Sequence, residues 1–223
     1  MTNRAIEKMW TVFAVGENRM LELRALWPKG LGNKRKPVVK HFSAADYPSV
    51  DNRKVAFENA ALELNLEGYN IYIVMNPIRP DYDSDGAVGD TGIDCRDLLL
   101  IDIDRTGDTT RPATDVELEA ARELAMVVRK YLQSLGWGMP FLVMSGNGYH
   151  LYYILDGVEN TPETRDMVAG VLHDLAARFD NDIVGIDTTV SNASRITKVP
   201  GTVMRKGQET PERPYRVAEV CDE

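Results

Sequence analysis

The second half of the sequence predicts a mixed α/β (α+β) protein with an antiparallel or mixed sheet, because strand patterns and helix patterns alternate along it in a recognisable order. An apolar strand pattern at residues 97–104 precedes a long amphipathic stretch that opens with a helix-capping motif. Two apolar runs joined by Gly146-Asn147-Gly148 then predict a β-hairpin. A second helix and a short strand complete the order β-α-β-β-α-β. This is the ferredoxin-like order, in which we expect the first and third strands to lie at the centre of the sheet.

The N-terminal part of the chain predicts a short helix followed by a hairpin. The helix is expected near residues 4–9. Met9 to Val15 and Met20 to Leu26 are expected to be two strands, with Gly16-Glu17-Asn18 as the turn. Residues 29–37 are rich in Gly, Pro and basic side chains and predict a loop.

A helix and a strand are expected next. Residues 53–66 have helical spacing, and Gly68 is a stop signal. The apolar side of this helix is predicted to consist of Val55, Ala56, Leu62 and Leu66. Residues 69–76 alternate as a strand, and residues 77–91, rich in Pro, Asp and Gly, predict a loop.

The strand at residues 97–104 contains four apolar residues and then alternates through Asp102 and Asp104. Thr114-Asp115-Val116-Glu117 is a capping box that opens a helix ending just before Gly136. The apolar stripe of this helix is predicted to be Leu124, Val128, Tyr131 and Leu135.

The hairpin strands are expected at residues 141–145 and 149–155. Thr161-Pro162 then caps and starts a second helix that extends through Phe179. Its apolar residues are Val168, Val171, Leu172 and Leu175. Residues 184–190 predict the last short strand.

The composition is that of a globular protein with a sizeable core, and it argues against several classes. No apolar run approaches the roughly 18 residues that span a bilayer, so no membrane partner is expected. No signal-peptide pattern follows the N-terminus, so we expect an intracellular, cytoplasmic protein. Cys95 and Cys221 form no CxxC motif or Cys/His cluster, so neither a disulfide framework nor zinc is expected.

The net charge of −8 argues at first sight against a nucleic-acid partner, but the charges are unevenly distributed. Positive charge collects between Arg24 and Lys54 and again from Arg195 to Arg216, whereas acidic residues concentrate from Asp81 to Glu123. Two basic flanks around an acidic centre can form phosphate-binding walls around a metal site. An unevenly charged, solvated surface is the alternative.

Three aspartates are candidate metal ligands. Asp102 and Asp104 are two residues apart on a strand, so both side chains project from one face, about 7 Å apart. Two such carboxylates repel unless a cation or a proton lies between them, and their hard oxygens suit Mg²⁺ or Mn²⁺. Asp187 ends the last strand and could join them. A pair of solvated acids at a strand end is the alternative.

The hairpin Ser145-Gly146-Asn147-Gly148-Tyr149-His150 is a candidate phosphate site. Gly146 and Gly148 allow the backbone to turn tightly, so that exposed N–H groups can bind a phosphate. His150 could donate a hydrogen bond to a phosphate oxygen. A structural histidine in a strand is the alternative.

Two cations follow Asp187. Arg195 and Lys198 are three residues apart, which on one helical turn would place both on the same side. A guanidinium together with an ammonium suits a triphosphate. A basic turn near the C-terminus is the alternative.

Four motifs in one order carry a resemblance to a known family. They are the apolar-DxD strand (residues 98–104), the S-G-x-G-x-H hairpin (145–150), Ile186-Asp187, and the run from Asn192 to Thr202. In this order, residues 69–202 resemble the catalytic core of the archaeo-eukaryotic primase superfamily. They are most similar to the primase–polymerase (prim-pol) proteins of phages, plasmids and mobile elements.

The resemblance implies one prim-pol domain over residues 1–223, with an N-terminal α/β unit (1–90) packed on an RRM-like catalytic unit (91–223). It implies that Asp102, Asp104 and Asp187 are catalytic and hold two divalent metal ions, Mg²⁺ or Mn²⁺. The nucleotide-binding residues expected from the motifs are Ser145, Gly146, Gly148, His150, Arg195 and Lys198.

The implied activity is template-directed synthesis on single-stranded DNA, from NTPs or dNTPs, by primer initiation, primer extension or both. The implied partners are therefore a single-stranded template and a primer. Many relatives continue into a helicase or a helical primase domain, and some carry a zinc-binding stem whose ligands are missing here. Lys34, Arg35 and Lys36 could contact template or primer phosphates, with a solvated loop as the alternative.

Other functions share parts of this pattern. Residues 99–106 also fit the apolar-DxDxT strand of a haloacid-dehalogenase-like phosphatase, with Asp102 as nucleophile, although about 100 residues precede it. A DxD glycosyltransferase would use the same metal chemistry but leaves the hairpin with His150 unexplained. A non-catalytic RRM-like module would display aromatic residues where this chain has carboxylates.

Overall fold

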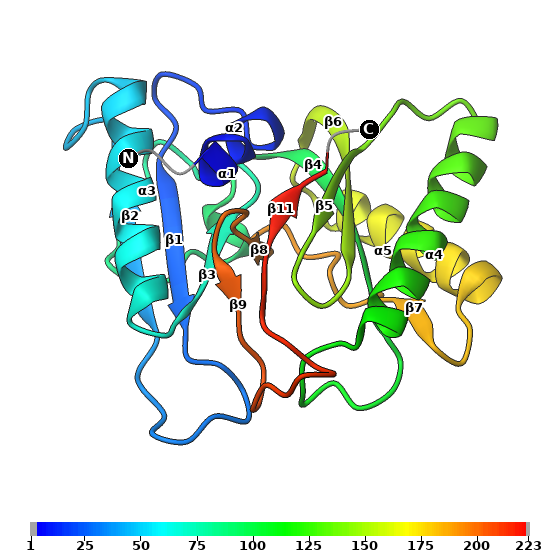
Figure 1. Ribbon diagram of the computed structural model, residues 1–223. Coiled ribbons are helices and arrows are strands. Elements are labelled where there is room, and N and C mark those ends of the chain that lie inside the picture. The colour runs from blue at the N-terminus through cyan, green and yellow to red at the C-terminus, as the bar shows by residue number, and fades with distance from the viewer. Residues whose placement is uncertain (1–3, 222–223) are drawn as a thin grey trace.

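The computed structural model describes residues 4–221, in which two β-sheets lie side by side with the longer helices on their outer sides (Figure 1). The α/β (α+β) class predicted from the sequence is confirmed. The larger sheet has the strand order β11-β5-β6-β4-β7, and every neighbouring pair in it is antiparallel. Its strands are β4 (Cys95–Arg105), β5 (Phe141–Met144), β6 (Tyr149–Glu159), β7 (Val184–Ile186) and β11 (Glu219–Val220).

Among the four strands of the predicted order, β4 and β6 are the two central ones, as the ferredoxin-like order predicts, and β11 adds a fifth strand beside β5. Their register places Asp102 directly opposite His150. Residues on each strand alternate between faces, so Leu99, Ile101 and Ile103 point to the helices while Asp102 and Asp104 point the other way. The sheet therefore separates an apolar core from a polar site.

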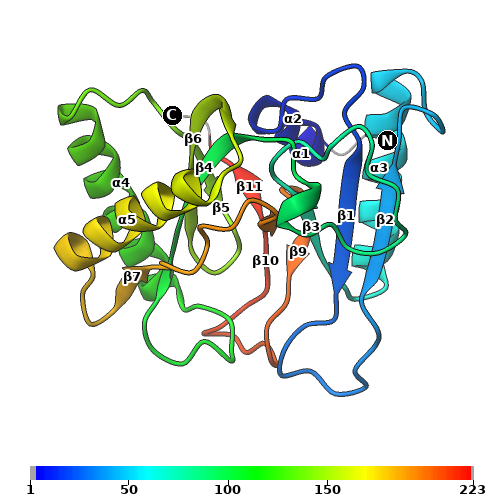
Figure 2. The ribbon, with the colours of Figure 1, turned by 180° about the vertical axis from the view of Figure 1, so that it is seen from behind.

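Two helices cover the outer face of the larger sheet, α4 (Asp115–Ser134) and α5 (Pro162–Phe179) (Figure 2). The capping box of α4 is confirmed: the Glu117 amide donates to Thr114 Oγ1 and the Thr114 amide donates to a Glu117 carboxylate oxygen. The buried residues of α4 include Leu124, Val128 and Leu132. Leu135, placed on the buried stripe from sequence, lies beyond the helix and is 58% exposed, because the chain turns there at Gly136.

The smaller sheet has the order β2-β1-β3-β8, and α3 (Val50–Leu66) packs on its outer side. Its strands are β1 (Leu21–Leu26), β2 (Val38–Phe42), β3 (Asn70–Val74) and β8 (Ile196–Lys198). Strand β8 comes from far along the chain and pairs with β3. Strand β8 lies after residue 90 but belongs to the smaller sheet, so the predicted units 1–90 and 91–223 do not coincide with the two sheets.

The predicted strand at residues 9–15 is wrong. Residues Met9–Val12 form the short helix α2, directly after α1 (Arg4–Glu7). Ile6, Met9 and Phe13 are buried, and this spacing of three and four residues is helical. The partner of β1 in a hairpin is instead β2, a strand that directly follows the basic loop at residues 29–37 and for which the sequence made no prediction.

Helix α3 lies where the sequence predicts it but buries a different side. Val55 and Leu66 are 48% and 86% exposed, whereas Phe57, Ala61 and Leu64 are buried. The reason is Arg53, which is fully buried and donates hydrogen bonds to the main-chain carbonyls of residues 16, 17, 19 and 47. A polar residue thus lies on the inward face of α3, so the spacing of the apolar residues alone does not identify this face.

Three loops lie at the lower edge of the molecule in Figure 1: residues 27–37, 106–113 and 205–215. The chain leads into and out of the third loop through β9 (Val203–Met204) and β10 (Arg216–Val217), which pair with each other.

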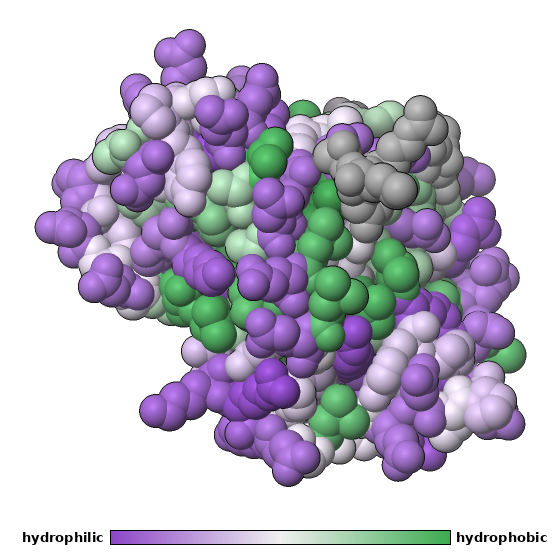
Figure 3. Space-filling model, turned by 60° about the vertical axis from the view of Figure 1, so that its left-hand side comes forward, coloured by the Kyte–Doolittle hydropathy of each residue, from purple (hydrophilic) through white to green (hydrophobic). Residues whose placement is uncertain are grey.

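Hydrophilic side chains cover most of the face seen in Figure 3, with the apolar ones gathered toward its middle. Among the described residues, no helix combines the length and apolar character that a membrane span needs.

Candidate active site

A cleft of about 350 Å³ lies where the two sheets meet. The larger sheet contributes Asp102 and Asp104 from β4 and His150 from β6, and the smaller sheet contributes Tyr72 from β3. The remaining lining residues come from β1, β4, β8, β9, the 145–148 turn and the flanking loops: Leu26, Lys29, Leu100, Ser145, Asn147, Arg195, Ile196, Thr197, Lys198, Met204 and Lys206. Most of the side chains singled out from the sequence are therefore brought together.

Asp102 and Asp104 project into the cleft from the same face of β4, with side chains 27% and 33% exposed. Burial alone would raise the pKa of Asp102, but the charge and hydrogen bond of His150, with the charges of Arg195 and Lys206, hold it below its ordinary value. Burial raises the pKa of Asp104, with the charge of Lys206 opposing and that of Asp102 adding to the effect. Relative to an ordinary aspartate, the ionised form is thus favoured at Asp102 and disfavoured at Asp104.

His150 lies between the two sheets and is 6% exposed. Its Nε2 is 3.3 Å from Asp102 Oδ1. Its Nδ1 lies 2.9 Å from the hydroxyl of Tyr152 and 3.2 Å from that of Thr197, and these two hydroxyls are hydrogen-bonded to each other. The ring is therefore held on both sides, with Nε2 as its cleft-facing nitrogen.

The glycines of the hairpin allow close packing. A Cβ at Gly148 would lie 2.1 Å from the carbonyl oxygen of Ile103, and one at Gly146 would lie 2.5 Å from Met204 Cβ. Their amides, expected to face a phosphate, are engaged inside the hairpin: Gly148 N–H donates to Ser145 Oγ, and Gly146 N–H points to the sulfur of Met144. The Ser145 hydroxyl also donates to the Gly148 carbonyl.

Asn147, which was not among the residues predicted from the sequence, is buried and lines the cleft. Its Oδ1 accepts a hydrogen bond from the Ala113 amide (2.8 Å), and this bond fixes the orientation of the side-chain amide. Its Nδ2 is a buried donor without a hydrogen-bond partner among the described residues. The sequence feature that points to Asn147 is its position between the two glycines of the hairpin motif.

Arg195 and Lys198 both line the cleft, but the helical turn predicted for them is wrong, because residues 196–198 form strand β8. Arg195 donates to the carbonyl of Thr189. Lys198 is buried, donates to the Val203 carbonyl at 3.2 Å and lies over the ring of Tyr72. Burial and the nearby Arg205 lower the pKa of Lys198 well below its ordinary value.

Lys206 is a second cleft residue that was not predicted from the sequence. Its Nζ lies 3.6 Å from Asp104 Oδ2. Gly207, in the left-handed region at φ +56°, donates its amide to the Lys29 carbonyl, and a Cβ there would lie 2.5 Å from the Thr110 carbonyl. The three lower loops thus touch one another, and this contact brings Lys206 to the cleft.

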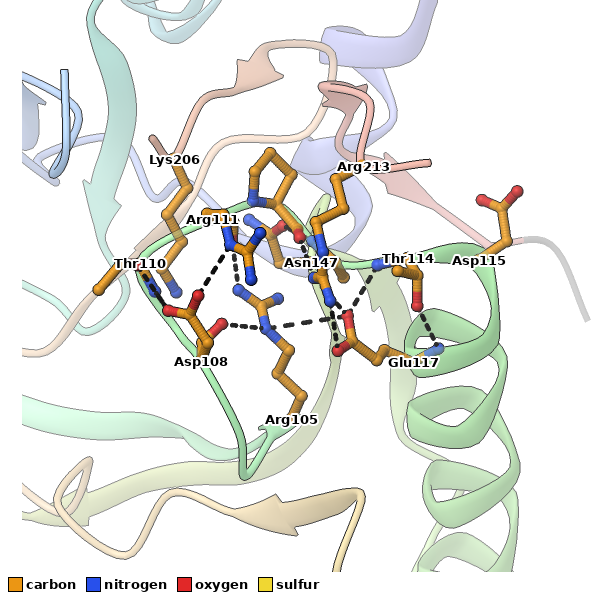
Figure 4. Close-up of polar contacts among 12 residues, drawn as sticks. Arg105, Asp108, Thr110, Arg111, Thr114, Asp115, Glu117, Asn147, Lys206 and Arg213 are labelled. Carbon is orange, nitrogen blue, oxygen red and sulfur yellow. Dashed lines mark hydrogen bonds and ion pairs between the residues drawn. The ribbon is translucent and has the colours of Figure 1, made fainter. Parts of the chain in front are cut away.

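An ion-pair network holds these loops on the start of α4 (Figure 4). Glu117 accepts two hydrogen bonds from Arg213, at 2.8 and 3.1 Å, and lies 4.0 Å from the buried Arg105. Arg105 donates to the carbonyls of Asp108 and Arg111. Glu117 therefore joins the 106–113 loop to the 205–215 loop beside Asn147 and Lys206.

Asp187 follows β7 next to Asp102, and its amide donates to the Asp102 carbonyl at 2.8 Å. Its Oδ1 accepts hydrogen bonds from the amide and hydroxyl of Thr189, a local turn that ends the strand earlier than the predicted residue 190. Within residues 4–221, no three acidic, His or Cys side chains are close enough to hold an ion by themselves.

The donor set of the cleft nevertheless suits a hard divalent ion. Asp102 and Asp104 offer carboxylate oxygens from one strand face, and Mg²⁺ commonly binds one or two carboxylates while substrate phosphates and water complete its shell. These two residues, with Asp187 beside them, are the ones that could hold it.

Lys34, Arg35 and Lys36 lie outside the cleft. All three are exposed, on the loop between β1 and β2. The Arg35 guanidinium stacks over the ring of Trp27 and lies 3.6 Å from Glu67. This loop reaches the cleft through Lys29.

No protein-family model and no curated protein sequence matches the chain. Solved structures do match it. The primase–polymerase domain of cyanophage S-2L aligns with 98% of this chain and 89% of its own, at a TM-score of 0.55 and 16% identity. The chain has the archaeo-eukaryotic primase–polymerase fold.

Two further solved structures share this fold. The polymerase domain of Mycobacterium tuberculosis ligase D, solved with DNA, aligns with 96% of this chain and 79% of its own, at a TM-score of 0.52 and 16% identity. The primase RepB′ aligns with 100% of this chain at a TM-score of 0.53 and 13% identity, and this chain spans 56% of its length. The phosphatase alternative gains no support, because β4 has antiparallel neighbours on both sides rather than lying in a parallel, doubly wound sheet.

Proposed function

We propose that the chain is a metal-dependent nucleotidyltransferase that synthesises DNA on a single-stranded template. The observation that supports this most is the pairing of Asp102 and Asp104 on one strand face, in a cleft that also contains Arg195 and Lys206, within the prim-pol fold. Carboxylates and cations in one cleft suit a substrate that brings both metal and phosphate.

Asp102, Asp104 and Asp187 would hold the metal, Mg²⁺ or Mn²⁺. A bound divalent ion supplies Lewis-acid stabilisation of the charge that develops on the phosphate oxygens. The lowered pKa of Asp102 keeps this carboxylate ionised at neutral pH, as a metal ligand must be.

The cleft offers separate surfaces for the phosphates and the remainder of a nucleotide. Its positive and hydrogen-bonding groups would bind the triphosphate, and its volume of about 350 Å³ lies in the range of small-ligand sites. The apolar surface of Tyr72, Leu100 and Met204 would contact the sugar or base. The phosphate-binding residues in this proposal are Ser145, Asn147, His150, Arg195, Lys198 and Lys206. Gly146 and Gly148 would shape the turn that carries Ser145 and Asn147, because their own amides are engaged inside the hairpin.

A template and primer would approach over the lower loops. Lys34, Arg35 and Lys36 are exposed on the loop that also places Lys29 at the cleft, so they would contact backbone phosphates outside the nucleotide site.

The deciding assay mixes the protein with Mn²⁺ or Mg²⁺, labelled NTPs or dNTPs and single-stranded DNA, with and without a primer. We expect metal-dependent, template-dependent products. Asp102→Ala and Asp104→Ala should each reduce synthesis to background. Asp174→Ala, an exposed acid on the outer helix α5, should leave it unchanged. If the wild-type protein yields no product with either metal, primed or unprimed, the proposal is wrong.

A further inference from the structure

Two hydroxyl groups that belong to neither the acids nor the hairpin motif contact the imidazole of His150. Tyr152 is on the same strand as His150, and its Oη lies 2.9 Å from Nδ1. Thr197 is on β8 of the other sheet, and its Oγ1 lies 3.2 Å from the same nitrogen. The two hydroxyls also hydrogen-bond to each other.

This cluster is shielded from solvent. Tyr152 is 0% exposed and Thr197 is 2% exposed. The Tyr152 ring packs edge-on against Phe13, with centroids 5.5 Å apart. Buried hydroxyls that bond to one another and to a ring nitrogen form a defined network, because each lost partner would leave a costly buried polar group.

The other ring nitrogen determines the direction of these hydrogen bonds. An ionised carboxylate can only accept, so Nε2, 3.3 Å from Asp102 Oδ1, carries the proton. In the neutral ring Nδ1 is then the acceptor. One of the two hydroxyls must then donate to Nδ1. Tyr152 is the nearer donor, and its oxygen can in turn accept from Thr197.

We propose that Tyr152 and Thr197 are positioning residues that hold His150 in its Nε2–H tautomer, with this N–H directed toward Asp102 and the cleft. Because Thr197 comes from β8, the tautomer and orientation of His150 depend on the docking of the smaller sheet against the larger one. For the proposed nucleotidyl transfer, on which this consequence rests, a pre-oriented donor would bind a substrate phosphate without first reorganising.

The tautomer is measured directly by ¹⁵N NMR of the imidazoles in the metal-free protein, at a pH of about 8.5 where an ordinary imidazole is neutral. The chain has three histidines, so His150→Gln identifies the His150 signals. We expect a protonated-type shift at Nε2 and an unprotonated-type shift at Nδ1. Tyr152→Phe removes one hydroxyl and Thr197→Val replaces the other with a methyl group, and each should move these shifts toward a tautomer mixture.

Tyr153→Phe is the matched control, because this neighbouring tyrosine is also buried and points to the other side of the sheet, where it packs on Trp137. It should leave the His150 shifts unchanged. A proton on Nδ1 in the wild-type protein would overturn the proposal. So would unchanged shifts in both folded variants, with folding checked by thermal melting.

Steady-state kinetics of the variants test the consequence for function. Tyr152→Phe should raise the nucleotide KM roughly threefold to tenfold, the loss of about one hydrogen bond. Combined with His150→Gln it should have almost no additional effect, whereas a purely structural role would give additive losses. Inactive wild-type protein would contradict the proposed function alone, since the NMR result stands independently.

Discussion

The ammonium of Lys206 lies 3.6 Å from Oδ2 of Asp104, although the two residues are far apart in the sequence. Burial raises the pKa of Asp104, and Lys206 is the strongest opposing influence. The contact exists because the 205–215 loop is held against the 106–113 loop, through Gly207 and through Glu117 with Arg213. A cation is thereby placed beside the carboxylates, where a nucleotide would bring its phosphates.

Removing this cation should weaken nucleotide binding. Lys206→Met is expected to raise the nucleotide Kd about tenfold, because it removes a charge-assisted contact that is largely shielded from solvent. Binding is measured by titration with a non-hydrolysable triphosphate and Mg²⁺. Lys34→Met, on the exposed loop, is the control and should leave the Kd unchanged. Equal Kd values for wild type and Lys206→Met would show that Lys206 does not face the nucleotide.

The exposed lysines of the 27–37 loop should bind nucleic acid rather than the nucleotide. Lys34→Ala with Lys36→Ala is expected to weaken single-stranded DNA binding and to reduce the salt dependence of log Kd by about 0.7 for each lost phosphate contact. The nucleotide KM should not change. Arg35 is left in place because it stacks on Trp27. Salt titrations by fluorescence anisotropy measure the slope, and an unchanged slope would mean that this loop is simply solvated.

Gly148 should be irreplaceable for a packing reason. Gly148→Ala would place a Cβ 2.1 Å from the Ile103 carbonyl oxygen, so we expect a loss of about 3 kcal/mol or more in the free energy of unfolding. Gly170, inside α5 with open space around it, is the contrasting site. Gly170→Ala should stabilise by about 0.5–1 kcal/mol. Urea unfolding of both variants tests this, and a stable Gly148→Ala protein would contradict the close approach of the hairpin to β4.

Glu117 should make a pH-dependent contribution to stability. Burial works to raise its pKa, but the hydrogen bonds from Arg213 and the Thr114 amide lower it below the ordinary value. A lowered carboxylate pKa stabilises the fold above the unfolded-state pKa of about 4.3, and this stability is lost as the pH falls through the folded-state pKa. Glu117→Gln keeps a capping-box side chain and should cost about 1 kcal/mol at pH 7.

The difference in unfolding free energy between wild type and Glu117→Gln should therefore shrink in acid. Glu117→Ala removes the capping contact as well and should cost about 1 kcal/mol more at every pH. Thermal melts of the three proteins at several pH values between about 3 and 7 provide the measurement. A constant difference between wild type and Glu117→Gln across this range would rule out the ion pair as its source.

Local patterns in the sequence determined much of the catalytic sheet. The capping box of α4, the hairpin turn and the alternation through Asp102 and Asp104 depend on residues within a few positions of one another, and the structure has all three. The β-α-β-β-α-β order restricts the topology, so it also predicted that β4 and β6 would be central. This order places Asp102 and His150 on neighbouring strands, as the structure has them.

Tertiary structure alone decided the rest. No local pattern marks β8 as a strand of the smaller sheet, because its partner β3 lies more than a hundred residues earlier in the chain. This pairing brings Thr197 to His150, and loop packing brings Lys206 to Asp104. The inward face of α3 likewise depends on carbonyl groups that Arg53 reaches in other segments. Such contacts join residues that are distant in sequence, so no local pattern of residue types predicts them. The turns, caps and alternation of the larger sheet depend on neighbouring residues, so local patterns do predict them.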